Sequence, residues 1–250
     1  MAEHARQWLC TNRLRLPLPD WAALLLTRWL DALDRLLGGR VPHETWIRYR
    51  RRLERTEAEP DSGEVVLTPI DDAIIAALAE HPWRDLPQLR SAQRLWRHGL
   101  RGGLIWRERG EPLCLQWLFT PEDNPRLRRL PEWAGMYPPL PPGCGQVENL
   151  LVLPKGLRRP GSAATVFAYA VYARARALGL EQLVTHVHEH NTPAHRWAMR
   201  TGWSAYGTIR RYRFDLPLLR GCCVYVHSSL PDRHGPAAAT MAPSAQPISH

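Results

Sequence analysis

Two consecutive strand–loop–helix units in the second half of the chain constrain its fold most. The run QVENLLVLP predicts a strand, and the loop after it leads into a helix over residues 161–178, which ends at Gly179. The run QLVTHVHEH predicts the next strand, and TPAHRWAMRTG predicts a helix with Thr192 as its N-cap and Gly202 past its end. This alternation of strands and helices is typical of an α/β domain.

Further short elements extend this domain over residues 62–231. Strands are predicted over residues 64–70, in a hairpin that turns around Gly110, and in two late runs, YGTIRRYRFDL and CCVYVHSSL. The runs DDAIIAALAEH and DLPQLRSAQRLWRHG predict helices with Asp71 and Asp85 as their caps. The run PEWAGMYPPLPPGCG is rich in proline and glycine and predicts an irregular loop or a lid.

Residues 1–60 are predicted to form a helical extension. The run LPDWAALLLTRWLDALDRLLGG predicts an amphipathic helix, because its apolar positions recur at helical spacing. These positions are Trp21, Leu24, Leu25, Trp29, Leu33, Leu36 and Leu37. The polar positions mix Asp31 and Asp34 with Arg28 and Arg35, so packing on the domain or on a second subunit is favoured over a membrane surface.

A charged run, HETWIRYRRRLERTEAE, follows this helix and predicts a second helix. The run EPDSG at residues 59–63 predicts a linker to the domain. Residues 232–250 show no periodicity and predict a disordered tail. Three roles stay open for the extension: it covers a substrate groove of the domain, forms a homodimer contact or binds another partner.

The composition narrows the classes of partner. The chain has 250 residues and a formal net charge of +9, but almost all of the basic charge is arginine and Lys155 is the only lysine. This enrichment is typical of a GC-rich coding bias, so nucleic acid is not favoured as a partner, whereas nucleotide phosphates are compatible. The five cysteines form no C-x-x-C pair, which argues against a zinc module. No apolar leader and no run of ~20 apolar residues is present, so we expect no transmembrane segment and a cytoplasmic location.

The loop between the first strand and its helix has the composition of a phosphate-binding site. It reads Arg158-Arg159-Pro160-Gly161-Ser162-Ala163. Glycine lets the backbone approach an anion closely, and the helix that follows offers unpaired N–H groups and the positive end of its dipole. Because Pro160 cannot donate a hydrogen bond, we expect this loop to rely on Arg158 or Arg159 as well.

Two motifs at matching mutual spacing resemble the GCN5-related N-acetyltransferase family. The family's phosphate loop, Q/R-x-x-G-x-G/A, is matched by Arg158, Gly161 and Ala163. Its later motif, N-x-x-A-x-x-[LF]-Y-x-x-x-G-F, is matched at Asn191, Ala194, Trp197, Gly202 and Trp203. The resemblance covers Glu64 to Leu230, and it implies a mixed, mostly antiparallel central sheet flanked by helices.

The resemblance also implies a donor site for acetyl-CoA or another acyl-CoA, without a metal. This site would occupy a V-shaped opening between the strand that ends near Leu153 and the strand that ends near Asn191. Backbone groups of the first strand would hold the pantetheine arm, and groups of the loop would hold the pyrophosphate. The residues implied in donor binding are Leu151, Val152, Leu153, Arg158, Arg159, Gly161, Ser162, Ala163 and Asn191.

For catalysis, the resemblance implies a base on the first strand and an acid on the second helix. Glu148 is the candidate base, on the face shared by Leu150 and Val152 if no bulge intervenes. The family's tyrosine is missing, because Ala198 occupies its place. Either another group, such as Tyr206, His195 or a water, protonates the leaving thiolate, or the protein does not catalyse.

The histidines of the second strand are candidates for the acceptor site. In the register set by Asn191, His186 and His188 lie on one side of the sheet, and Thr185 and Val187 lie on the other. A structural role stays open for both histidines. Metal binding is not favoured, because no cysteine or carboxylate cluster lies beside them. We expect His195 to be a solvated helix residue.

Three functions remain open on the sequence. The leading one is an N-acyltransferase that moves acetyl from acetyl-CoA to the primary amine of a small molecule or protein. The second is a non-catalytic coenzyme A sensor or scaffold, which the missing tyrosine motivates. The third is a transferase of the same fold that uses aminoacyl-tRNA, which only the arginine excess suggests.

Overall fold

The computed structural model describes residues 14–16, 18–54, 65–130, 133, 135–159, 162–216 and 222–230. Within these residues the strands form one sheet of nine strands in the order β1-β9-β8-β2-β7-β6-β5-β4-β3. The strands are β1 (Leu14–Leu16), β2 (His43–Arg52), β3 (Leu67–Pro69), β4 (Gly103–Glu108), β5 (Glu111–Phe119), β6 (Cys144–Val152), β7 (Gln182–His188), β8 (Ser204–Arg213) and β9 (Cys223–Ser229). All neighbours pair antiparallel except β1 with β9 and β6 with β7. The expected mixed, mostly antiparallel sheet is confirmed.

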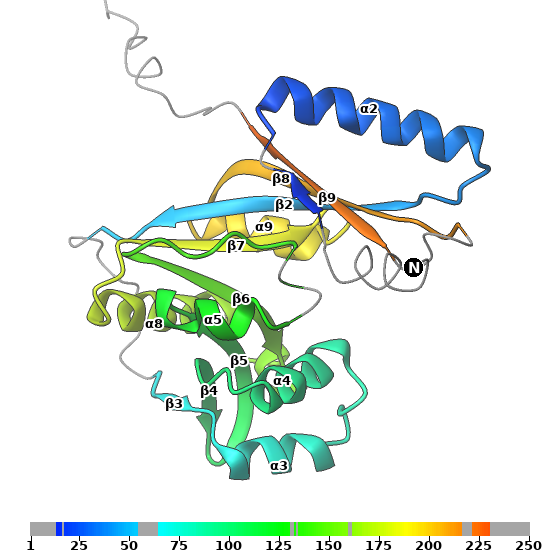
Figure 1. Ribbon diagram of the computed structural model, residues 1–250. Helices are drawn as coiled ribbons and strands as arrows, with labels where there is room; N and C mark the ends of the chain where they lie inside the picture. The colour runs from blue at the N-terminus through cyan, green and yellow to red at the C-terminus, as the bar shows by residue number, and fades with distance from the viewer. Residues whose placement is uncertain are drawn as a thin grey trace, which may run out of the picture.

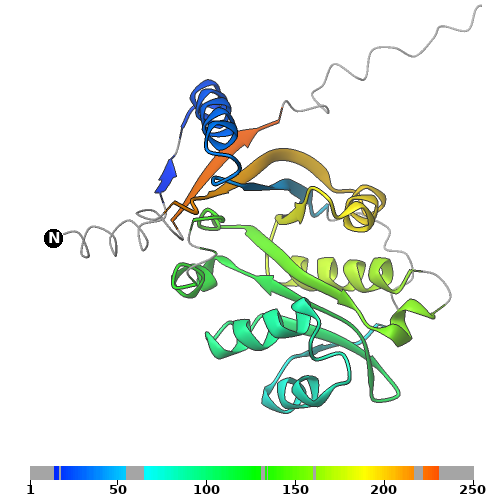
Figure 2. The same cartoon turned by 90° about the vertical axis from the view of Figure 1, so that its right-hand side faces the viewer.

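Helices cover both faces of this sheet (Figure 1). They are α2 (Asp20–Leu36), α3 (Asp72–Glu80), α4 (Pro87–Arg97), α5 (Asn124–Leu127), α7 (Pro154–Leu157), α8 (Ala163–Ala177) and α9 (Thr192–Arg200), with a 3-10 turn at Pro121–Asp123. Helices α8 and α9 pack on one face through an apolar cluster that includes Phe167, Tyr172 and Trp197. Helices α3 and α4 pack on the opposite face through a second cluster around Leu95 and Trp117. Helix α2 packs on β8 and β9 at the far end of the molecule (Figure 2).

The largest correction to the sequence analysis concerns the N-terminal segment. The charged helix predicted after α2 is wrong: His43–Arg52 form strand β2, which lies between β7 and β8 in the sheet. The alternation of Thr45, Ile47 and Tyr49 explains the strand, because these side chains point to one face and pack there. The extension predicted for residues 1–60 therefore supplies a central strand as well as a helix.

Buried Arg51 shows how a charged residue is accommodated in this central strand. Its Nη1 donates to the carbonyl oxygen of Thr201, and its guanidinium lies 4.8 Å from the ring centroid of Tyr172. Gly202 makes room for it, because a Cβ at this positive-φ position would collide with the guanidinium. One arginine thus joins β2 to α8 and to the end of α9.

The other elements agree with the sequence except at their ends. The hairpin around Gly110 and the cap of α3 by Asp71 are confirmed. Asp85 does not cap α4, which starts at Pro87, and α9 is capped by Asn191 instead of Thr192. The linker over residues 59–63 and the tail over residues 232–250 lie outside the described residues. No described helix combines the length and the apolar character needed to cross a membrane.

Candidate functional site

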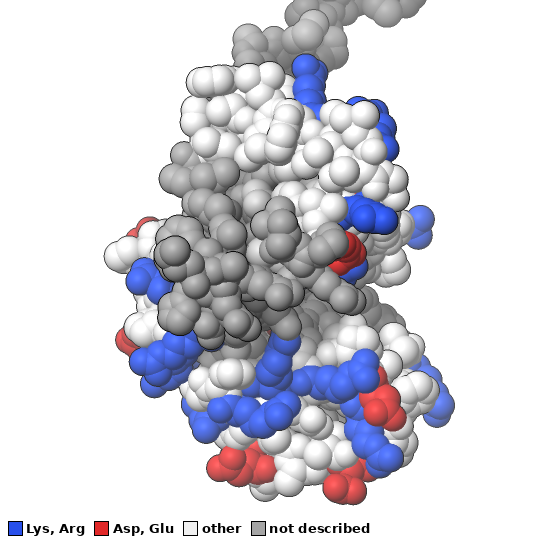
Figure 3. Space-filling model, turned by 45° about the vertical axis from the view of Figure 1, so that its right-hand side comes forward, with Lys and Arg blue, Asp and Glu red and all other residues white. Residues whose placement is uncertain are grey.

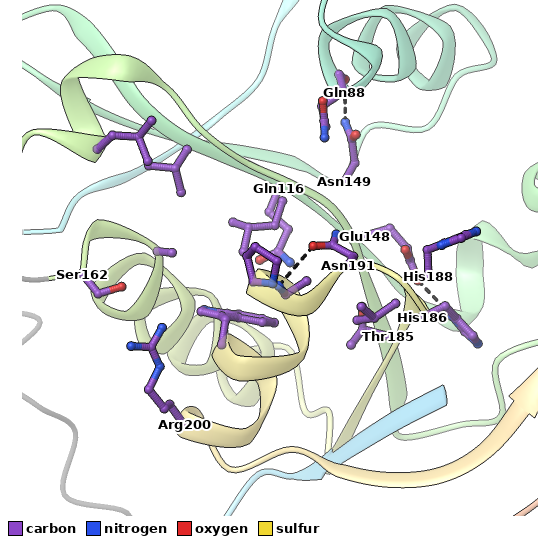
Figure 4. Close-up of a pocket in the computed structure, with 18 residues that line it drawn as sticks. Gln88, Gln116, Glu148, Asn149, Ser162, Thr185, His186, His188, Asn191 and Arg200 are labelled. Carbon is purple, nitrogen blue, oxygen red and sulfur yellow. Dashed lines mark hydrogen bonds and ion pairs between the residues drawn. The ribbon is translucent and has the colours of Figure 1, made fainter. Parts of the chain in front are cut away.

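A V-shaped opening forms where the two central parallel strands separate. Strands β6 and β7 are in register only from Cys144 opposite Gln182 to Gln146 opposite Val184. Beyond that point β6 follows β5 and β7 follows β2, so the two strands diverge. The opening holds a cavity of about 520 Å³ (Figure 4). It is lined by Gln88, Gln116, Glu148, Asn149, Leu150, Val152, Leu157, Ser162, Ala164, Thr185, His186, Val187, His188, Asn191, Pro193, Ala194, Trp197 and Arg200.

A β-bulge in β6 shapes the wall of this cavity. Asn149 has a positive φ of 61°, and the register with β5 shifts there. Its side-chain Nδ2 donates to the carbonyl oxygen of Gln88 over 2.9 Å, which ties the bulge to α4. Because the bulge adds one residue, Glu148 faces the α4 side of the sheet, whereas Leu150 and Val152 face α8. The expectation that all three share a face is corrected by this bulge.

The edge of β6 that borders the opening offers free backbone groups. The Leu153 N–H donates to the Leu113 carbonyl over 2.8 Å, so the backbone groups of Leu153 point toward β5. Backbone groups of successive strand residues point to opposite edges, and those of Val152 therefore point into the opening. The register with β7 has already ended at this level. An extended ligand with amide groups can pair with this edge as an added strand would.

Glu148 and His186 form a buried pair on the wall of the cavity. The Nδ1 of His186 lies 2.9 Å from Oε1 of Glu148, and their side chains are 1% and 10% exposed. Gln146 Nε2 donates to the same carboxylate oxygen over 3.0 Å, and the ring of Tyr137 lies 4.3 Å from that of His186. Burial lowers the pKa of His186, although its contact with Glu148 acts in the opposite direction. A neutral imidazole that donates from Nδ1 to the carboxylate satisfies this arrangement.

The other two histidines of interest have different surroundings. His188 lines the cavity and meets the ring of Trp46 edge to face at 5.4 Å. His195 lies outside the cavity: its Nε2 is 3.1 Å from the carbonyl oxygen of His188, and its Nδ1 is 2.9 Å from the Tyr49 hydroxyl. Since a carbonyl only accepts, Nε2 carries the proton and Tyr49 donates to Nδ1. His195 is thus bound to β2 and β7, and the expectation of a solvated residue is wrong.

The N-terminus of α8 borders one end of the cavity. Ser162 caps the helix by accepting from the Thr165 N–H, and Ser162 and Ala164 line the cavity. The first two amides of the helix, those of Ala163 and Ala164, have no partner within the helix, whereas the Thr165 amide is bonded to Ser162. The positive end of the helix dipole lies at this end of the cavity. Pro160 and Gly161 of the expected phosphate loop lie outside the described residues.

The arginines are arranged differently from the sequence-based expectation. Arg158 lines a separate cavity beside Lys155, and the Arg159 guanidinium lies 4.6 Å from the ring centroid of Trp106. Neither lines the cavity between β6 and β7, whereas Arg200 from the last turn of α9 does. Sequence reasoning missed Arg200, because its position depends on how α9 packs against α8.

The candidate acid is not brought to the cavity. Tyr206 lies under the guanidinium of Arg48, at 4.4 Å from the ring centroid, and burial raises its pKa. It is absent from the described residues that line the cavity. Ala198, at the place of the family's tyrosine, is fully buried in the cluster beneath α8 and α9. Among the described residues no group of three His, Cys, Asp or Glu side chains could hold a metal ion.

Known proteins resemble this chain in structure, but none of those compared by sequence matches it. No protein-family model matches the sequence, and neither does any curated protein. A solved structure of a GCN5-related glucosamine N-acetyltransferase region in a fungal multi-domain β-N-acetylglucosaminidase has a TM-score of 0.52 at 11% identity. The match covers 72% of this chain and 22% of the fungal chain, so this chain corresponds to about a fifth of that protein.

Two bacterial structures show weaker likeness. A GCN5-related N-acetyltransferase from Sphaerobacter thermophilus has a TM-score of 0.48 at 14% identity, over 74% of this chain and 56% of that one. A GNAT-family acetyltransferase assigned from Novosphingobium aromaticivorans has a TM-score of 0.45 at 16% identity, over 68% and 64%. The sheet, the splayed strands and the fungal match together define the GCN5-related N-acetyltransferase fold, and this chain has that fold.

Proposed function

We propose that this protein transfers an acyl group, acetyl in the first instance, from coenzyme A to a primary amine of a small molecule or protein. One observation carries the proposal: the free edge of β6, the N-terminus of α8 and the carboxylate of Glu148 all line the same cavity. This combination matches a donor with an amide-bearing arm, a pyrophosphate and a thioester. The fold supports the same reading, since its neighbours include acetyltransferases.

In this proposal the donor site is built from backbone and helix ends. The backbone groups of Val152, at the edge of β6 that borders the opening, pair with the amides of the pantetheine arm. The N–H groups at the start of α8 donate hydrogen bonds to the pyrophosphate. Arg200 adds a positive charge at the same end of the cavity. The roles implied for Leu151 and Leu153 are supporting ones, because Leu153 donates its N–H to β5. Asn191 holds the start of α9 by accepting from the Ala194 N–H.

Glu148 is the proposed general base. An amine becomes nucleophilic only when it is uncharged, and Glu148 takes up its proton directly or through one water. The amine nitrogen then bonds to the thioester carbonyl carbon, the carbon–sulfur bond breaks, and the surplus proton on the nitrogen passes through water to the departing thiolate. His186 and Gln146 orient the carboxylate, while His188 lines the acceptor side. Positioning of the two substrates supplies most of the remaining acceleration.

A second function is favoured by a specific observation. The family's tyrosine is replaced by buried Ala198, and Tyr206 does not line the cavity. A coenzyme A sensor needs the donor site but needs no acid to protonate a leaving thiolate. Such a protein binds acetyl-CoA and releases no thiol with any amine.

One experiment separates the two functions. Purified full-length protein is mixed with acetyl-CoA and a panel of amines that spans amino sugars, polyamines, amino acids and peptides with free amino termini, and thiol release is followed. The acyltransferase proposal predicts release with one class, strongly reduced in Glu148→Gln. Donor binding without release across a broad panel supports the sensor. Absence of binding rejects both.

A further inference from the structure

The outward face of α2 carries most of the large exposed apolar side chains in the N-terminal part of the molecule. They are Trp21, Leu24, Leu25, Trp29 and Leu36, which are 51% to 84% exposed. The inward face is apolar too, because Ala23, Leu30 and their neighbours pack on β8 and β9. A helix that is apolar on both faces is normally covered on both. We call these five exposed side chains the α2 strip.

The acidic side chains of α2 are hydrogen-bonded to the rest of the protein. Asp31 accepts from the Tyr212 hydroxyl and from Arg210, and Asp34 accepts from the Val41 N–H. Asp20, at the start of the helix, accepts from the Ser229 N–H. All three carboxylates are therefore engaged by the body of the protein.

The arginines of the helix have no hydrogen-bond or ion-pair partner among the described residues. Arg28 and Arg35 are exposed and seven residues apart, so both lie on the same outward side of the helix as the α2 strip. The space-filling view shows this end of the molecule as a mostly white surface with blue patches and one red patch at its margins (Figure 3). The sequence argued against a membrane because aspartate and arginine are mixed along the helix. In the structure the three carboxylates are hydrogen-bonded to the rest of the protein, whereas Arg28 and Arg35 have no such partner among the described residues.

The shape and charge of the strip favour a lipid surface over another protein. A single helix on the outside of the molecule is convex, and it can sink into the boundary between headgroups and acyl chains without a complementary groove. A symmetric pair of such helices would bring Arg28 and Arg35 of both copies close to one another.

We propose that α2 binds the protein peripherally to an anionic phospholipid surface, with the α2 strip inserted at the headgroup level and Arg28 and Arg35 against lipid phosphates. Trp21 and Trp29 are the anchors, since tryptophan partitions to the membrane–water interface. The arginines provide the preference for anionic lipid, because basic residues near such a surface are attracted by its negative potential. The cavity between β6 and β7 takes no part in this binding, so the proposal stands apart from the acyltransfer.

Vesicle co-sedimentation of the full-length protein tests the proposal. Vesicles of phosphatidylcholine alone are compared with vesicles in which a third of the lipid is phosphatidylglycerol. We expect binding to the anionic vesicles that weakens with salt. The double variant Trp21→Ser/Trp29→Ser should bind at least about tenfold more weakly. The pair Arg28→Gln/Arg35→Gln should lose about fivefold or more of the preference for anionic vesicles while keeping the weak binding to neutral ones.

A matched control comes from the other end of the molecule. Trp83, between α3 and α4, is 48% exposed, and Trp83→Ser should bind vesicles as the wild type does. The proposal is overturned if the wild type binds neither kind of vesicle, or if Trp83→Ser lowers binding as much as the α2 variant. It is also overturned if light scattering shows a dimer that Trp21→Ser/Trp29→Ser dissociates, because a second copy would then cover the strip.

Discussion

The cavity between β6 and β7 and the outer face of α2 depart from ordinary burial in opposite directions. At the cavity a carboxylate and an imidazole, Glu148 and His186, are nearly removed from solvent. On α2, Trp21 and Leu36 are 69% and 84% exposed. Buried charge and large exposed apolar side chains are the two informative exceptions to the rule that apolar groups lie inside. Each has a cost in the isolated chain, and the two proposals each name a partner that would offset this cost.

The two regions also differ in how well their side chains are supported by contacts within the isolated chain. Glu148 is held by two donors, and the bulge at Asn149 is tied to α4, so the cavity wall is preformed. The α2 strip has no such support, and only the opposite face of the helix is packed. A preformed polar wall suits chemistry that needs fixed geometry. An exposed apolar strip without fixed polar contacts suits a lipid surface, because lipid molecules can rearrange around it.

The largest expected effect is at the buried carboxylate. Glu148→Gln keeps the shape and the bond to Gln146 but removes the base, so we expect turnover to fall by about a hundredfold or more. Affinity for acetyl-CoA, measured by calorimetry, should stay within about twofold, because the loss is confined to the chemical step. Glu189→Gln, which changes an exposed carboxylate just past the end of the neighbouring strand β7, is the control. Equal rates for Glu148→Gln and the wild type would remove Glu148 from the mechanism.

Adjacent positions on α2 test the contrast between its two faces. Leu30 is 2% exposed and Trp29 is 59% exposed. Leu30→Ala should lower the free energy of unfolding by about 2–5 kcal/mol, because it leaves a cavity against β8 and β9. Trp29→Ser should change it by less than about 0.5 kcal/mol in urea titrations. A large loss for Trp29→Ser would mean that the strip is already covered within the chain.

A smaller effect is expected at the anion-binding end of the cavity. Ala164 lies in the first turn of α8, where a carboxylate favours the helix but opposes a phosphate. Ala164→Glu should therefore weaken acetyl-CoA binding by about tenfold or more while the unfolding temperature stays level or rises. Ala164→Gln, of similar size and no charge, should bind more tightly than Ala164→Glu. Equal affinities would show that charge at this position is irrelevant to the donor.

The smallest effect is a pH dependence of stability at the buried pair. Burial lowers the pKa of His186 in the folded protein below its ordinary value of 6.5. Below about pH 6.5 the unfolded chain then binds more protons than the folded one, so stability falls as the pH decreases and levels off above this value. His186→Gln should flatten this slope in urea titrations between about pH 5 and 7. His190→Gln, whose side chain is 80% exposed, should leave the slope unchanged.

Much of the fold was predictable because periodicity and caps are local. The alternation of His186 and His188 against Thr185 and Val187 holds in the structure, and the helices after both strands begin and end close to their predicted residues. Strand β2 was not predicted, because its arginines suggested a charged helix. The available signal was the β-branched and aromatic character of Thr45, Ile47 and Tyr49 at alternate positions.

The site was predictable to the level of strands and helix ends but not of individual contacts. The place of the opening follows from two motifs in sequence. The bulge at Asn149, which moves Glu148 to the α4 side, depends on a positive φ that asparagine tolerates and that no periodic pattern reveals. The contact of Arg159 with Trp106 and the position of Arg200 in the cavity wall depend on packing between distant segments. Such contacts are fixed only by the tertiary structure.

Hydrogen–deuterium exchange of the full-length protein with and without acetyl-CoA would locate the donor site. We expect slower exchange at residues 148–153 of β6 and at the first turn of α8, and unchanged exchange over α2. The amide of Val152 should show the strongest protection, since it faces the opening and no described strand pairs with β6 on that side at this level. Protection confined to the neighbourhood of Lys155 and Trp83, or no protection anywhere, would contradict the assignment of the cavity between β6 and β7 as the donor site.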